Sequence, residues 1–391
     1  MQNKKRTLLK AAAAIVLVGS SVLAHADDVI KIGLIVPMSG PFASTGRQVD
    51  AAVKLYIAQH GDTVAGKKIQ VILKDDTNVP DTTKRLAQEL IVNDHVAVLA
   101  GFGLTPLALA AAPLATQAKV PMVVMNAATA MITEQSPYIV RTGFTLPQNT
   151  LGIARWAPKN GIKKVVSIVA DYGPGIDAQN SFKKVFEAEG GTIVEQIRVP
   201  VANPDFSPFL QKVSDLKPDA LFVFVPSGAG AVFMKQFAER GLAKQGIKLI
   251  GTGDVVDDDI LNNMGDVALG AVTSMNYSAA LDNPDNKAYV AAFEKANPGM
   301  RPNFHSVGAY DGMHLIYAAL EATKGDTSGD KLLAAMKTQK WNSPRGPVQI
   351  DPDTREIIQN VYITKTERVN GELYNVPFDK IEAVKDPAKI K

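Results

Sequence analysis

The chain has 391 residues, 46% of them hydrophobic, and its 42 lysines and arginines against 39 aspartates and glutamates give a net charge of +3. Because the sequence contains no cysteine, disulfides, zinc–thiolate sites and cysteine nucleophiles are all excluded. The apolar share and the small net charge exclude a mainly disordered chain, and the length favours about two domains.

The N-terminus has the pattern of a secretory signal peptide. Four basic residues between positions 4 and 10 precede the apolar run Ala11–Val18, and Ala24 and Ala26 are spaced as at a cleavage site. This run is shorter than the roughly 20 apolar residues of a membrane-spanning helix. We expect cleavage after Ala26 and an exported protein. Residues 27–391 then carry a net charge of −1, which gives no electrostatic reason to expect nucleic-acid binding.

From Val29 onward, short β-rich runs alternate with helical patterns. Strands are predicted at Val29–Val36, Ile69–Lys74, Val96–Ala100, Met122–Met125, Val165–Ala170, Thr192–Val199, Ala220–Val225 and Lys248–Ile250. Helices are predicted at Gln48–Gln59, Thr82–Ile91, Leu107–Ala118, Gln179–Glu189, Ala231–Arg240, Asn286–Ala296 and His305–Thr323. The alternation, with several strands almost wholly apolar, predicts an α/β fold whose parallel sheets are covered on both faces.

The two series of strands predict two doubly wound lobes, with the first crossover near Thr142–Asn149. Towards the end of the chain, Val361–Thr366 and Leu373–Val376 flank Asn370-Gly371, a dipeptide suited to positive φ. This pattern predicts a closing β-hairpin.

Ligands of open parallel sheets bind beyond the carboxyl ends of the strands, so the loops after the strands are the candidate sites. In the first lobe these loops contain Ser39, then Thr105 before Pro106, then Ala128 and Thr129. Thr105 is suited to cap the helix that follows, and the free N–H groups of such a helix start attract a carboxylate. The alternative is that Thr105 only caps the helix.

In the second lobe, Tyr172 lies in a glycine-rich turn, where its ring is well placed to cover a ligand. Ser227 and Asp254 follow two further strands of this lobe. Asp254 could accept hydrogen bonds from an ammonium group, or it could be an ordinary carboxylate in a turn.

Several other motifs predict no chemistry. The segment Gly61–Lys68 resembles a phosphate-binding loop but ends in lysine and precedes a strand, so it is interpreted as a polar turn. The acids near Asp254 lack the spacing of a calcium loop, and Asp258 or Asp259 is expected to start a short helix toward Asn263. The histidines at positions 60, 95, 305 and 314 lack metal-type spacing, which favours surface or core roles. No G-x-S-x-G motif occurs, and we expect no enzyme, no metal and no cofactor.

Six segments carry a family resemblance through their order and spacing: Ile32–Gly40, Leu107–Pro121, Ala128-Thr129, Asp171–Gly173, Phe237–Leu242 and Gly346–Val348. The sequence resembles the leucine/isoleucine/valine-binding family of periplasmic binding proteins, which capture substrates for ABC transporters. The resemblance implies two Rossmann-like lobes joined by three crossovers, with a ligand cleft between them. It assigns residues 27–145 and 276–355 to lobe 1 and residues 146–275 and 356–391 to lobe 2.

The resemblance also implies roles for single residues. Thr105, Ala128 and Thr129 would hold the ligand carboxylate, Tyr172 would cover the ligand, and Asp254 would receive an α-ammonium group. The chain departs from the family where a serine pair is common, because it has Leu104-Thr105 there, and Phe102 is expected to add an aromatic wall to the pocket.

The expected ligand is an amino acid of branched-chain type, and an aromatic or aliphatic carboxylate or amide remains open. The expected partner is an inner-membrane ABC permease, and the expected state is a periplasmic monomer without nucleic acid. A ligand sensor for a signalling receptor is the alternative output.

Overall fold

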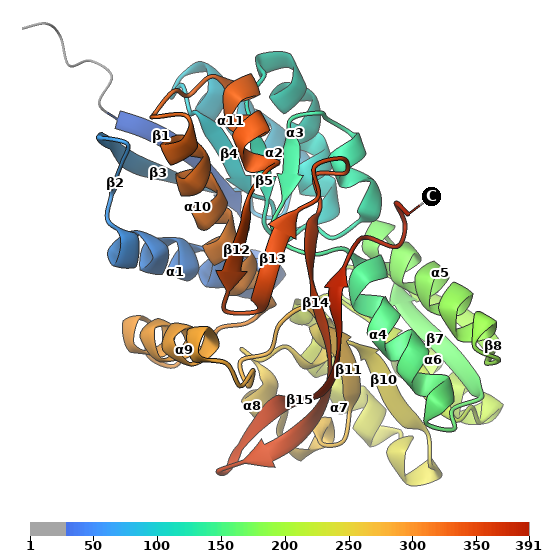
Figure 1. The fold of residues 1–391 in the computed structure, drawn as a ribbon. Helices are drawn as coiled ribbons and strands as arrows, with labels where there is room; N and C mark the ends of the chain where they lie inside the picture. The colour runs from blue at the N-terminus through green and yellow to red at the C-terminus, as the bar shows by residue number, and fades with distance from the viewer. Residues whose placement is uncertain (1–28, 391) are drawn as a thin grey trace, which may run out of the picture.

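The computed structural model describes residues 29–390, so the predicted signal peptide and its cleavage site lie outside the described residues. Two α/β lobes lie one above the other in Figure 1. The first sheet is largely parallel, whereas the second combines parallel strands with antiparallel pairings. Within residues 29–390, no helix combines the length and apolar character needed to cross a membrane.

The first lobe contains a six-stranded sheet with the order β2-β3-β1-β4-β5-β6. Its strands are β1 (Val29–Val36), β2 (Thr63–Val64), β3 (Lys67–Asp75), β4 (Val98–Gly101), β5 (Met122–Val124) and β6 (Ile139–Arg141). Helices α1 (Ala43–His60) and α10 (Phe304–Ala322) share one core with β1, and α2 (Pro80–Val92) and α3 (Thr105–Ala118) share another core with the opposite face. Helices α9 (Pro284–Ala296) and α11 (Gly329–Met336) pack against α1 and α10, respectively.

The second sheet has the order β12-β13-β14-β11-β10-β9-β7-β8, and β15 pairs with β14. Its strands are β7 (Lys164–Ala170), β8 (Thr192–Val199), β9 (Ala220–Phe224), β10 (Lys248–Thr252), β11 (Val272–Met275), β12 (Lys340–Ser343), β13 (Gly346–Ile350), β14 (Ile357–Val369) and β15 (Glu372–Val384). The parallel strands are β11-β10-β9-β7-β8, and the antiparallel pairings are those of β12, β13, β14 and β15. Its helices are α4 (Leu146–Lys159), α5 (Gly173–Ala188), α6 (Ser207–Leu216), α7 (Ser227–Glu239) and the short α8 (Leu261–Met264).

Strand β9 shows why the central strands are apolar on both faces. Phe222 stacks on Phe182 of α5 with ring centroids 4.1 Å apart, whereas Leu221 and Val223 belong to the opposite core with Phe233 of α7. Successive side chains of a strand point to opposite faces, so every residue of β9 is buried. Each such side chain stabilises the fold by about 1.5–3 kcal/mol.

The chain passes between the lobes three times. It leaves β6 for α4, which packs against β11; it returns after β11 to α9, which packs against α1; and it enters β14 after Asp351. The first passage confirms the crossover predicted near Thr142–Asn149. The exact division of residues 276–355 and 356–391 between the lobes stays a prediction, and strands β12 and β13 of the former segment join the second sheet through β14.

The predicted strands and the hairpin are confirmed, and β1 and β8 have the predicted bounds. Gly61–Lys68 contains β2 and the first residues of β3, and the predicted turn is confined to Ala65 and Gly66, which both have positive φ. Strands β2, β6, β12 and β13 and helices α4, α6 and α11 were not predicted.

Two expectations about helix starts are wrong. Helix α8 begins at Leu261, because Asp258 instead accepts hydrogen bonds from the Ala279 N–H and from Asn375, and Asp259 accepts one from Ser44. Helix α3 begins at Thr105 itself. Its N-cap residue is Leu104, so the Thr105 hydroxyl is available for another partner.

Candidate ligand-binding site

A small hollow with a cavity volume of about 30 Å³ lies between the two lobes. Its aromatic walls are Phe42, Phe144, Tyr172 and Phe224, and its polar lining consists of Thr45, Thr105, Asn126, Ser227, Asp254 and His305. Both lobes contribute to the lining, so the hollow depends on how closely the lobes approach each other.

Five of the eight predicted site residues line this hollow: Thr105, Ala128, Tyr172, Ser227 and Asp254. Thr129 lies directly behind, with its Oγ1 2.8 Å from Thr105 Oγ1. Ser39 and Phe102 do not reach the lining.

The expected pocket roles of Phe102 and Ser39 are therefore corrected. Phe102 has a φ of 68°, which turns its fully buried side chain into the core shared by α2 and α3. Its backbone instead shapes the site, because its N–H donates to Ile35 O and its carbonyl accepts from Ala127 N. Ser39 is exposed and contributes hydrogen bonds to Asp75.

Helices α1, α3, α5 and α7 begin at the hollow without a side-chain cap, and the N-cap residue of α1 is Phe42. The N-cap residues of α3, α5 and α7 are Leu104, Tyr172 and Pro226, and all three line the hollow. By contrast, α4 and α10 also begin there but are capped by Thr145 and Asn303. The uncapped helix ends carry partial positive charge, which suits a bound anion.

The start of α5 touches the threonine pair across the interlobe boundary. A Cβ on Gly173 would lie only 2.5 Å from Thr129 Oγ1, so a larger residue could not occupy this position without displacement. Nearby, the Ala130 N–H donates to Asp177 of α5 at 2.8 Å. These contacts place the lobes in a closed arrangement around the hollow.

Two further residue pairs form hydrogen bonds across the same boundary. Ser44 of α1 donates to Asp259 at 2.6 Å, and the Asn303 amide donates to Asp257 at 2.9 and 3.0 Å. Burial raises the pKa of Asp257 to about 7, and the nearby Asp259 carboxylate adds to this increase.

Asp254 is the acid of the lining and is 5% exposed. Burial raises its pKa to about 7, although Thr252 donates a hydrogen bond of 2.7 Å that favours the charged form. The pKa of the neighbouring Tyr172 is also raised by burial and by the Asp254 charge. Near neutral pH, Asp254 therefore alternates between a neutral and a charged state.

His305 and Asn126 form a buried pair at the hollow, with the His305 Nδ1 2.9 Å from Asn126 Oδ1. The His305 Nε2 lies 3.4 Å from both Thr45 Oγ1 and Ser227 Oγ. Burial lowers the pKa of His305 to about 3, so the imidazole is neutral at physiological pH. His305 is buried, in agreement with the expected core role, and it also lines the hollow.

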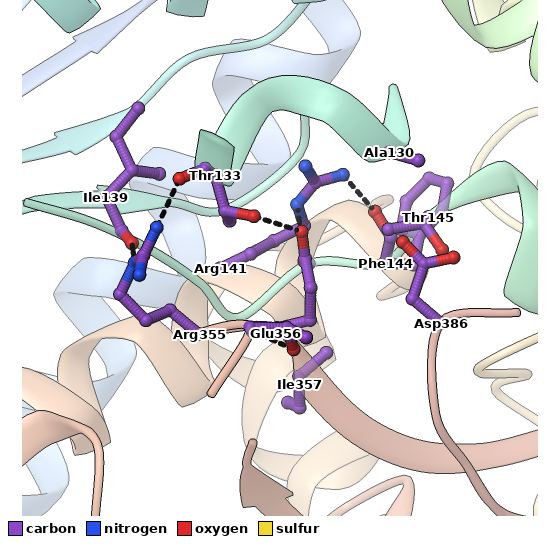
Figure 2. A network of polar contacts seen from close by, with 12 residues as sticks. Ala130, Thr133, Ile139, Arg141, Phe144, Thr145, Arg355, Glu356, Ile357 and Asp386 are labelled. Carbon is purple, nitrogen blue, oxygen red and sulfur yellow. Dashed lines mark hydrogen bonds and ion pairs between the residues drawn. The ribbon is translucent and has the colours of Figure 1, made fainter. Parts of the chain in front are cut away.

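Arg141 lies fully buried behind the site and braces two of its loops, as Figure 2 shows. Its Nη2 donates to Thr129 O at 2.7 Å, its Nη1 donates to Phe144 O at 3.1 Å, and its Nε lies 3.0 Å from Glu356 Oε2. Glu356 also accepts from Thr133 and pairs with Lys389, each at 2.8 Å. This network connects the start of the first passage between the lobes, at Arg141, to the third passage, at Glu356.

Several lining residues were missed by sequence reasoning. Asn126 follows β5 in a loop that the sequence already singled out, so its position alone could have identified it. His305 is the second residue of α10, 179 positions further along the chain, and no local signal marks it. Within residues 29–390, no group of three or more histidine or acidic side chains could hold a metal ion.

A family model described as "Periplasmic binding protein" matches residues 29–371. The Leu/Ile/Val-binding protein homolog 6 of Brucella melitensis is 44% identical over 98% of both chains. A solute-binding protein of an ABC transporter from Rhodopseudomonas palustris BisB5, solved with 3,4-dihydroxybenzoic acid, is 65% identical with a TM-score of 0.91, covering 93% of this chain and 100% of that one. A solute-binding protein from R. palustris solved with 4-hydroxybenzoate is 44% identical with a TM-score of 0.90, at the same coverage.

Proposed function

The chain belongs to the periplasmic binding protein family, and from this premise we propose that it captures a small aromatic carboxylate for uptake by an inner-membrane ABC permease. The observation that carries the proposal is a hollow with aromatic walls whose lining includes the N-cap residues of the uncapped helices α3, α5 and α7. The family and fold are those of transporter substrate-binding proteins and not of enzymes.

The carboxylate would bind at the ends of α3 and α5, beside the Thr105–Thr129 pair. Charge-assisted hydrogen bonds contribute about 1.5–3 kcal/mol each. After the cost of ordering the ligand and closing the lobes, a few such bonds give about −8 kcal/mol, which corresponds to a micromolar dissociation constant.

An aromatic ligand without an amine fits this lining better than a branched-chain amino acid. The walls of the hollow are aromatic, which suits a planar ring. Burial raises the pKa of Asp254 to about 7, so a large part of this acid is uncharged near neutral pH and tolerates an uncharged ring. The proteins of known structure that are 65% and 44% identical to this chain were solved with hydroxybenzoates, which supports the same ligand class.

Ligand capture would proceed by closure of the lobes. The bonds from Ser44 to Asp259 and from Ala130 to Asp177 exist only when the lobes meet, so closure buries the ligand and forms these contacts together. The closed shape is the one that a permease would recognise. The predicted signal peptide and the family membership both support a periplasmic location.

A thermal-shift panel tests the proposal. A ligand at about 100 times its dissociation constant stabilises the protein by about 2.7 kcal/mol. We expect benzoate and hydroxybenzoates to raise the melting temperature and leucine, isoleucine and valine to leave it unchanged. A shift with leucine and none with any aromatic acid would overturn the proposed ligand class.

A further inference from the structure

We propose that His305 and Asn126 together recognise a ring hydroxyl of the ligand, so that the preferred ligand is a phenolic carboxylate whose hydroxyl donates to His305 Nε2. This inference rests on the proposed function and narrows its ligand class.

The backbone of His305 is held in place at the start of α10. Asn303 caps this helix, and its Oδ1 accepts from the N–H groups of His305 and Ser306 at 3.0 and 3.1 Å. The Phe304 ring packs against the imidazole with centroids 4.1 Å apart. The ring of His305 is thus fixed before any ligand binds.

The contact with Asn126 sets the tautomer of His305. An amide oxygen only accepts hydrogen bonds, so the bond of 2.9 Å between His305 Nδ1 and Asn126 Oδ1 requires the proton on Nδ1. A neutral imidazole has one N–H, so Nε2 carries a lone pair and is an acceptor.

This acceptor is poorly satisfied by the protein. Its neighbours, the hydroxyls of Thr45 and Ser227, are both 3.4 Å away, longer than a well-formed hydrogen bond. Asn126 is 2% exposed, and its Nδ2 is buried without a hydrogen-bond partner. The hollow therefore contains a weakly bonded acceptor and an unpaired donor on two contacting side chains.

A phenolic hydroxyl complements this acceptor, because it can donate to His305 Nε2 while Asn126 keeps the proton on Nδ1. A carboxylate cannot donate, and its charge gains nothing from a neutral imidazole. A methoxy group cannot donate either. The carboxylate is thereby directed to the helix ends beside Thr105 and the hydroxyl to the His305 side.

The groups that face the imidazole support a neutral ring. Thr45 of α1, Ser227 of α7 and Asn126 of the loop after β5 are all uncharged. The nearby acid Asp257 is bonded to Asn303 and to the Asp259 N–H. Because the ring stays neutral, the preference for a hydroxyl should be constant between pH 5 and 8.

Calorimetric titrations with benzoate, the three hydroxybenzoates and 4-methoxybenzoate test the inference. One hydroxybenzoate should bind the wild-type protein at least about tenfold more tightly than benzoate, and the methoxy compound should gain nothing. In His305→Phe this preference should fall below threefold. His314→Phe, which alters a histidine of the same helix stacked on Trp341, should keep the wild-type preference.

Nitrogen NMR of the imidazoles provides a second measurement that needs no folded variant. The His305 signals should show the proton on Nδ1 in the free protein, and the Nε2 signal should move when a hydroxybenzoate binds but not when benzoate binds. A proton on Nε2, or a tenfold preference that persists in His305→Phe, would overturn the inference. Absence of binding by every aromatic acid would instead overturn the proposed function.

Discussion

Replacing Asp254 by asparagine should remove a pH dependence from ligand binding. Asp254 lines the hollow, and burial raises its pKa to about 7, so the acid is neutral below this pH and ionised above it. An anionic ligand in the same hollow disfavours the ionised form further. Binding is therefore strongest below about pH 7 and weakens as the pH rises through it.

The size of the effect follows from that pKa. About one tenth of Asp254 is ionised at pH 6 and about nine tenths at pH 8. An ionised Asp254 and a carboxylate roughly 7 Å apart repel each other by about 2 kcal/mol at an effective dielectric constant of 20, which is roughly a thirtyfold loss of affinity. Binding then depends mainly on the neutral form of Asp254, and the affinity of the wild-type protein should fall about eight- to tenfold from pH 6 to pH 8.

Calorimetry with benzoate at pH 6, 7 and 8 measures this fall, because the benzoate carboxylate stays ionised throughout. Asp257 and Asp258, whose pKa values burial raises to about 7 and about 6, are present in both proteins, so the difference between the proteins isolates Asp254. Asp254→Asn should bind benzoate at pH 6 within threefold of the wild type. Between pH 6 and pH 8 its affinity for benzoate should fall about tenfold less than that of the wild type. Equal slopes in the two proteins would refute the reasoning, and loss of benzoate binding by Asp254→Asn at pH 6 would show that the ligand needs the carboxyl group of Asp254 itself.

Three further substitutions test other parts of the site. Thr129→Ala removes one hydroxyl of the threonine pair and should weaken benzoate binding at least tenfold by calorimetry; unchanged affinity would exclude Thr129 from the carboxylate site. Arg141→Leu leaves Glu356 buried without its arginine partner and should lower the free energy of unfolding by about 3 kcal/mol in urea titrations, and a loss below about 1 kcal/mol would contradict a structural role. Asp177→Asn weakens the bond from Ala130 N across the lobes and should reduce benzoate affinity about fivefold with an unchanged ligand-free melting temperature; a lower melting temperature at unchanged affinity would argue against a role in closure.

The strands could be predicted because a buried strand is an apolar run that is visible in the local sequence. Strands such as β1 and β9 are short apolar runs bounded by polar turns, and this pattern has few other structural solutions. Helix α4 was missed because its sequence contains Pro147, Gly152 and Pro158, which disfavour a helix in isolation. It forms because Thr145 and Gln148 make a capping box and because its apolar face packs on the second sheet.

Some site residues could likewise be identified from the local sequence, whereas others are brought to the site only by the folding of distant segments. Thr105, Tyr172 and Asp254 were found because each follows a strand, and the carboxyl ends of parallel strands meet at one edge. Phe102 also follows a strand, but its positive φ turns the side chain into the core, which no residue pattern indicates. The His305–Asn126 pair depends on α10 returning to the first lobe, so it required the folded chain.

The two ends of the proposed ligand would therefore be recognised by different parts of the protein. The carboxylate end depends on the backbone at the starts of α3 and α5, and most side-chain substitutions leave such N–H groups in place. The ring end depends on the side chains of Asn126 and His305, which the fold itself does not dictate. Substitutions at these two positions should thus change which aromatic acid is preferred while the protein continues to bind carboxylates. A variant of either position that lost benzoate and hydroxybenzoate equally would show that recognition of the two ends is coupled.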